Sequence, residues 1–181
     1  MSRLLSYLVT LTWGLWIGGI GGVTLAVIAL SKTYAPGTTA VLAPGSPSGS
    51  ASDAVDVFGT VAPAVFALFE RFQLGFAAAA LILTFGWRLC RGAAGLKTTL
   101  FALFAVATVA AVVETAVIAP KMNHLRAEKL TKSPEFEQAH RMSERLYGGT
   151  LLVLAGAGAV LITAVGRESV GRARTLDALD A

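Results

Sequence analysis

The chain has 181 residues, of which 55% are hydrophobic and only 14% are charged, with a formal net charge of +4 and a mean hydropathy of +0.67. This composition is too apolar for a soluble domain of this length. The basic residues flank apolar runs, as in membrane helices, and so favour no nucleic acid partner. We expect a single transmembrane domain over residues 1–181, with the lipid bilayer as its partner.

Four apolar runs are each long enough to cross a bilayer, which takes about 20 residues of helix. They lie near residues 5–30, 62–87, 98–119 and 146–166. A lipid-exposed backbone must satisfy its own hydrogen bonds, and no run alternates with the period of a barrel strand. The predicted fold is therefore an all-α bundle of four membrane helices.

The first run contains a glycine repeat within "TWGLWIGGIGGVTLA". Gly14, Gly18 and Gly22 recur every four residues, so one helix face lacks side chains and a neighbouring helix can approach closely. This face is predicted to be a packing groove for another span, and a homodimer packed on it is an open alternative. Trp13 and Trp16 are expected to fill the bundle interior.

A loop and a hairpin follow the first run. Residues 32–53 are rich in Pro, Gly and Ser, which predicts a flexible loop. Pro63 is expected at the start of the second span, where its missing N–H costs no hydrogen bond. The short basic segment between Trp87 and Lys97 predicts an antiparallel hairpin of the second and third spans.

Charged residues lie inside the second and third spans. Counting at about 1.5 Å per residue from the hairpin puts Glu70 and Glu114 at nearly the same depth, with Arg71 beside them. A charge in hydrocarbon is costly and normally pairs inside the bundle. We therefore predict a contact of Arg71 with Glu114 or Glu70, with Gln73 as a hydrogen-bonding neighbour.

This polar cluster allows two interpretations. The carboxylates could form the charge site of a carrier or permeation element for an ion or small solute. Alternatively, the protein is a structural or accessory membrane protein in which the buried charges only specify how the helices pack. The first interpretation predicts a water-accessible cavity at the carboxylates, and the second a closed interior in which Arg71 is paired.

The third loop, from Pro120 to Arg145, is the most polar segment. Pro120 is predicted to end the third span. Ser133, followed by Pro134, is a typical helix start, and an amphipathic helix is expected to lead from it into the fourth span. Spacings of four, three and four then place a set of side chains on one face, namely Phe136, His140, Ser143 and Tyr147.

Methionines near the two histidines make copper-type metal handling in this loop a third hypothesis. The candidate ligands are Met122, His124, His140 and Met142. Residues two apart on a helix point to different faces, so neighbours in this set could share an ion only outside a helix. Neither histidine lies in a predicted span, which argues against a haem, and no catalytic or nucleotide-binding motif is present. We predict no cofactor and no enzyme.

Four stretches, "WGLWIGGIGG", "FERFQ", "ETAVIAPKMNHLR" and "FEQAHRMSERLYGG", resemble the transmembrane protein 205-like family, a four-helix membrane family described by a domain of unknown function. The resemblance covers roughly residues 5–165. It implies a four-span protein whose polar positions gather near one membrane face, here Glu114, Pro120, Met122, His140 and Ser143. An association of the eukaryotic relative with platinum-drug resistance adds metal or solute export as an expectation.

Orientation is predicted from the basic residues at the ends of the spans. They are balanced between the two sides, but Arg88 and Arg91 gather at one end of the second span, while the other end is nearly free of them. The basic end should stay in the cytoplasm. Both termini, including a tail over residues 167–181, are therefore expected to be cytoplasmic.

Overall fold

The computed structural model describes residues 2–33, 51–90 and 94–177, and every regular element within these ranges is helical. The elements are α1 (Ser2–Thr33), α2 (Ala51–Arg88), α3 (Ala94–Val113), the π-helical turn η1 (Glu114–Ile118), α4 (Ala119–Ala127) and α5 (Pro134–Asp177). Within these described ranges, four helical stretches are long and apolar enough to cross a membrane, namely Arg3–Ala29, Val65–Arg88, Ala94–Ala127 and Pro134–Val170. The predicted all-α bundle of four membrane helices is confirmed.

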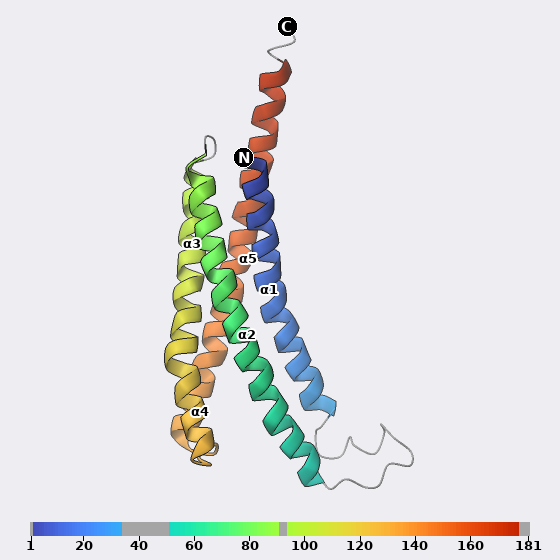
Figure 1. Cartoon of the computed structure of the whole chain (residues 1–181), viewed down its shortest axis with the longest axis vertical. Helices are drawn as coiled ribbons and strands as arrows, with labels where there is room; N and C mark the ends of the chain where they lie inside the picture. The colour runs from blue at the N-terminus through green and yellow to red at the C-terminus, as the bar shows by residue number, and fades with distance from the viewer. Residues whose placement is uncertain (1, 34–50, 91–93, 178–181) are drawn as a thin grey trace, which may run out of the picture.

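The helices run up and down, and the chain begins and α5 ends at the same end of the bundle (Figure 1). α1 packs on α2, α2 on α3, and α3 on α5, while α4 packs on α5 and η1. Toward the end opposite the termini, α1 and α2 run away from α4 and the beginning of α5 (Figure 1). The predicted antiparallel hairpin of the second and third spans is present as α2 and α3.

Small residues form much of the bundle interior, and large apolar residues cover its outside. Ala107 and Ala111 of α3 and Ala157 and Ala164 of α5 are fully buried. Large side chains such as Ile82, Leu152 and Ile162 are exposed. This arrangement suits a bundle in lipid, where close packing of backbones drives association and apolar surface outside carries no penalty.

The tryptophans of α1 occupy the interior, as predicted. Trp16 is fully buried and stacks on Phe104, with ring centroids 6.3 Å apart. The Trp13 indole N–H donates to the Leu154 carbonyl oxygen over 2.7 Å. A Cβ on Gly158 would collide with the Trp13 ring, so this glycine is required for the contact.

The predicted glycine groove is not used within the described part of the chain. A Cβ added at Gly14, Gly18 or Gly22 would meet nothing within 4 Å. Instead, Gly19 makes the close approach, because a Cβ there would lie 2.8 Å from Phe69 Cε2. Burying the large Trp16 side chain turns its face of α1 inward and leaves the glycine repeat outside.

Several helix boundaries differ from the predictions. α2 begins at Ala51 and contains Pro63 in its interior, and α1 continues to Thr33. Helix therefore occupies both ends of the loop predicted over 32–53, and residues 34–50 lie outside the described ranges. The predicted tail is helical as far as Asp177, and residues 178–181 are not described. Alanine is the strongest helix former and precedes and follows Pro63, and because helix formation is cooperative the helix continues past a single unfavourable residue.

Pro120 does not end the third span, because a π-helical turn precedes it. The Ala119 N–H donates to the Glu114 carbonyl, five residues earlier, and α4 continues through Pro120 to Ala127. A proline ring normally clashes with the carbonyl four residues before it. The wider π turn provides room for the ring and inserts one extra residue at Glu114–Ile118.

The start of α5 agrees with the prediction. The Ser133 hydroxyl oxygen accepts a hydrogen bond from the Phe136 N–H over 3.2 Å, which is the contact of a helix cap. From Pro134 the helix continues without a break into the fourth span and ends at Asp177.

Candidate functional site

One long seam between α3 and α5 organises the polar residues of the bundle. On α3 and η1 the buried positions recur at intervals of three and four residues: Lys97, Leu100, Phe104, Ala107, Ala111 and Glu114. On α5 the buried positions from Thr150 onward follow the same spacing, and the buried Ser143 lies seven residues before Thr150 with the partly buried Tyr147 between them: Ser143, Thr150, Leu154, Ala157, Leu161 and Ala164. The seam is apolar in the middle and ends in a polar cluster at each side.

Glu114 and Ser143 form the polar contact at the α4 end of the seam. Glu114 is the first residue of η1 and is 2% exposed. Its Oε1 atom accepts a hydrogen bond from the Ser143 hydroxyl over 2.7 Å. Its Oε2 atom is buried and has no hydrogen-bond partner among the described residues. A buried carboxylate oxygen without a partner is costly, and such groups mark candidate functional sites.

Three further groups complete what we call the carboxylate cluster, defined as Glu70, Glu114, Arg126, Ser143 and Tyr147. The half-buried Glu70 on α2 interacts electrostatically with Glu114 and with Arg126 of α4. The Tyr147 hydroxyl, one turn beyond Ser143, experiences the charges of both carboxylates. This hydroxyl is also buried without a hydrogen-bond partner in the described chain.

Two more buried oxygen atoms belong to residues next to the cluster in sequence. The Gln73 side chain is 2% exposed, one turn from Glu70 on α2, and its Oε1 atom has no partner among the described residues. The Thr115 hydroxyl, adjacent to Glu114 in η1, is likewise buried and unpartnered within the described ranges. Oxygen atoms therefore predominate among the polar groups of this region.

The predicted pairing of Arg71 with a carboxylate is wrong. Arg71 is exposed, and none of the ion pairs between described residues includes it. Neighbouring helical residues point about 100° apart, and α2 turns Phe69 and Gln73 inward. The cation near Glu70 is Arg126, which stands more than fifty residues away in the chain. No local pattern indicates that pairing.

Arg126 is held beside the cluster by two contacts of its own. Its Nη1 atom donates to Asn123 Oδ1 over 2.8 Å, and its guanidinium lies 5.5 Å from the centroid of the Phe136 ring. In the sequence, Arg126 is one of several basic residues of the third loop. In the structure it belongs to α4, which continues from the π turn, and it interacts electrostatically with Glu70.

The residues predicted to share one face of α5 differ in how deeply they are buried. Ser143 is buried and Tyr147 is partly buried, with its ring 6.2 Å from that of Phe66. His140 stacks on Phe136 but stays exposed. Of the loop residues on this face, Ser143 and Tyr147 therefore belong to the carboxylate cluster, and His140 lies at its edge.

The candidate metal ligands do not form a group. His124 and His140 are exposed, and each lies 3.4 Å from the glutamate four residues later in the chain, Glu128 just after the end of α4 and Glu144 within α5. Met142 is exposed, whereas Met122 is buried in a small cluster with Ile118 and Ala139. Within the described ranges no group of three or more His, Cys, Asp or Glu side chains is placed to hold a metal ion.

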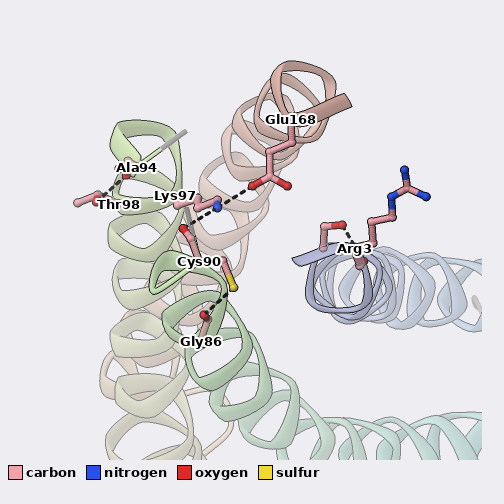
Figure 2. Close-up of polar contacts among 8 residues, drawn as sticks. Arg3, Gly86, Cys90, Ala94, Lys97, Thr98 and Glu168 are labelled. Atoms are coloured by element: carbon pink, nitrogen blue, oxygen red, sulfur yellow. Dashed lines mark hydrogen bonds and ion pairs between the residues drawn. The ribbon is translucent and has the colours of Figure 1, made fainter. Parts of the chain in front are cut away.

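The other end of the seam holds a buried ion pair that the sequence analysis missed. Figure 2 shows Lys97 of α3 reaching toward Glu168 of α5, and the Lys97 Nζ to Glu168 Oε1 distance is 2.6 Å. The exposed fractions of the two side chains are 0% and 8%. Nζ also donates to the Cys90 carbonyl oxygen over 3.2 Å and lies 5.2 Å from the Trp87 ring centroid. Figure 2 also shows the Cys90 thiol contacting the Gly86 carbonyl.

The position of Lys97 could have been read from its spacing. It stands three residues before the buried Leu100 and so continues the inward face of α3. Sequence reasoning treated it as a basic residue at the membrane edge, because lysines commonly occur there. Glu114 follows Lys97 by 17 residues, which corresponds to about 25 Å along a helix, so the two clusters lie near opposite ends of a bilayer-spanning seam.

Comparison of the chain with known protein families, with curated proteins and with solved structures gave no match. The functional argument therefore depends on the sites themselves. What is established is a multi-pass membrane protein built from four apolar helices.

Proposed function

We propose that this membrane protein is a carrier or permeation element for an ion or small solute, with Glu114 and Glu70 as its charge site. The supporting observation is Glu114 Oε2, a carboxylate oxygen buried without a partner among the described residues. The Glu114 carboxylate interacts electrostatically with a second carboxylate, that of Glu70, and with the buried hydroxyl of Tyr147. A group that binds and releases an ion needs an oxygen atom that no hydrogen bond occupies.

The packing interpretation explains these features less well. It requires Arg71 to be paired with the buried charges, and Arg71 is exposed. A hydrogen bond to Ser143 would serve helix packing equally well with a neutral amide at position 114. A carboxylate at 2% exposure is costly, and specifying the packing gives no reason to retain its charge.

Access to the site is supported on the α2 side. Glu70 is half-buried rather than enclosed. A groove of about 630 Å³ lies nearby on α5 and is lined by Gln138, Arg141, Met142, Arg145 and Leu146. Its lining does not include the carboxylates, so access through Glu70 is the proposed route.

Metal handling in the third loop is the weaker alternative. It requires His124 and His140 to converge on an ion, but each is exposed beside the glutamate four residues later in the chain. A partner glutamate could in principle join a histidine as ligand. Two ligands on one exposed helix turn do not make a closed site.

The test is flux through the purified protein in lipid vesicles, measured as uptake of ²²Na⁺ and ⁸⁶Rb⁺ and as internal pH with a trapped dye. We expect Glu114→Gln to abolish flux while the melting temperature in detergent falls by no more than a few degrees. Glu144→Gln, an exposed glutamate on α5, is the matched control and should retain full flux. Equal flux in wild type and Glu114→Gln would refute the proposal, and loss of folded protein only would favour the packing interpretation.

Orientation and family are part of the proposal. We propose that both termini are cytoplasmic, on the basic residues Arg88 and Arg91 at that end of the hairpin. Membership of the transmembrane protein 205-like family is proposed on the four sequence stretches alone. The hydrogen bond between Ser143 and Glu114 supports this proposal, because the resemblance implies that both positions gather near one membrane face.

A further inference from the structure

We propose that the carboxylate cluster binds one dehydrated monovalent cation of the Na⁺ class, with Glu114 Oε2 and the Tyr147 hydroxyl oxygen as its central ligands. This inference deepens the proposed function, on which it rests for the role of the bound ion. It concerns the identity of the ligand and can be tested by binding alone.

The donor atoms select the class of ion. The buried atoms on the cluster residues without a hydrogen-bond partner among the described residues are a carboxylate oxygen of Glu114 and the phenol oxygen of Tyr147. Oxygen donors suit hard cations, whereas softer transition metals prefer imidazole and thiolate. The neighbouring His140 is exposed and lies beside Glu144, so no imidazole of the described chain joins the set.

The net charge of the carboxylate cluster indicates the charge of the ion that it binds. The charged groups that act on one another here are Glu70 from α2, Glu114 from η1 and Arg126 from α4, while α5 contributes the neutral Ser143 and Tyr147. When both carboxylates are ionised, Arg126 balances one of them, and a single negative charge remains. One monovalent cation restores neutrality, as burial in a low-dielectric interior requires.

The geometry holds Glu114 ready for such an ion. Ser143 occupies Oε1 at 2.7 Å and thereby orients the carboxylate, while Oε2 remains available. Tyr147 lies one turn from Ser143 on α5, so both groups come from a single rigid helix. A divalent ion such as Mg²⁺ would call for octahedral coordination and several retained waters, which a carboxylate at 2% exposure does not favour.

The experiment uses the full chain in lipid nanodiscs at fixed pH and fixed ionic strength. Equilibrium binding of ²²Na⁺ is measured by scintillation proximity, and thermal melting is recorded in NaCl and in choline chloride. We expect one bound Na⁺ per chain and a melting temperature several degrees higher in NaCl. Glu114→Gln should weaken binding at least tenfold and abolish the sodium-dependent shift, while Glu144→Gln should preserve both.

A second variant keeps the test decisive if Glu114→Gln does not fold. Tyr147→Phe removes one ligand oxygen and keeps the ring against Phe66, so it should fold and bind Na⁺ several-fold more weakly. Absence of bound Na⁺ in the wild type, or wild-type affinity in both variants, would overturn the inference. Na⁺ binding without flux would remove the proposed function only, whereas proton flux indifferent to Na⁺ would remove this inference only.

Discussion

The buried ion pair of Lys97 and Glu168 gives the sharpest stability prediction. Glu168→Gln takes the carboxylate partner from an ammonium group that is 0% exposed. The Cys90 carbonyl at 3.2 Å and the Trp87 ring at 5.2 Å remain, but neither carries a full negative charge. Removing one partner of a buried pair costs about 3–5 kcal/mol.

This cost should be visible as a lower melting temperature. For a chain of this length, about 2–4 °C is lost per kcal/mol, so Glu168→Gln should melt roughly 6–20 °C below wild type. Lys97→Met should lose a similar amount, since it leaves the Glu168 carboxylate buried without its ammonium partner. The assay is tryptophan fluorescence during heating in mild detergent, because Trp87 lies directly at the pair.

Two controls isolate the ion pair from general sensitivity. The double variant Lys97→Met with Glu168→Met removes both charges and should melt close to wild type or above it, since apolar replacements of buried pairs are often neutral or stabilising. Glu137→Gln breaks the exposed pair with Arg141, whose side chains are 57% and 65% exposed, and should cost less than about 1 kcal/mol. A Glu168→Gln variant as stable as Glu137→Gln would refute the reasoning.

Two further substitutions test the packing and the helix start. Gly158→Ala should destabilise the protein by about 1–3 kcal/mol, because the added Cβ would collide with the Trp13 ring. Gly156→Ala is the control and should not destabilise it, because the space around Gly156 is open. Equal melting temperatures of the two variants would contradict this prediction. Ser133→Ala removes the cap of α5 and should cost about 1 kcal/mol, measured as faster amide hydrogen exchange in the first turn of α5, with Thr131→Ala as the comparison. Unchanged exchange there would show that the cap contributes nothing.

The polar clusters at the two ends of the seam suit different roles. The ion pair at Lys97 and Glu168 is satisfied by short contacts between groups of opposite charge. The carboxylate cluster instead leaves oxygen atoms unpartnered among the described residues. A buried charge that stabilises the fold should be fully paired, whereas a buried group that binds an ion needs an unpaired atom. The first cluster is therefore the better candidate for holding the helices together, and the second for binding an ion.

Much of the architecture could be predicted from sequence. Apolar runs of sufficient length determined the number of spans, and Ser133 followed by Pro134 located the start of α5. The hairpin between Trp87 and Lys97 placed Glu70 and Glu114 at a common depth, and the two carboxylates do interact. These features depend on the length and local chemistry of the chain, which sequence determines directly.

Which face of each helix turns toward the bundle interior was decided only by the tertiary structure. Arg71 was predicted to pair inside the bundle and is exposed. The row of Gly14, Gly18 and Gly22 was predicted to pack against another span or a second copy of the chain, and an added Cβ there meets nothing within 4 Å. Lys97 was placed at the membrane edge and lies buried. In water an apolar face must turn inward, so hydropathy reports the rotation of a helix. In lipid an outward leucine costs nothing, and the rotation is determined instead by which small residues and polar partners meet. Those partners, such as Arg126 for Glu70 and Glu168 for Lys97, come from distant segments, and only the assembled bundle brings them together.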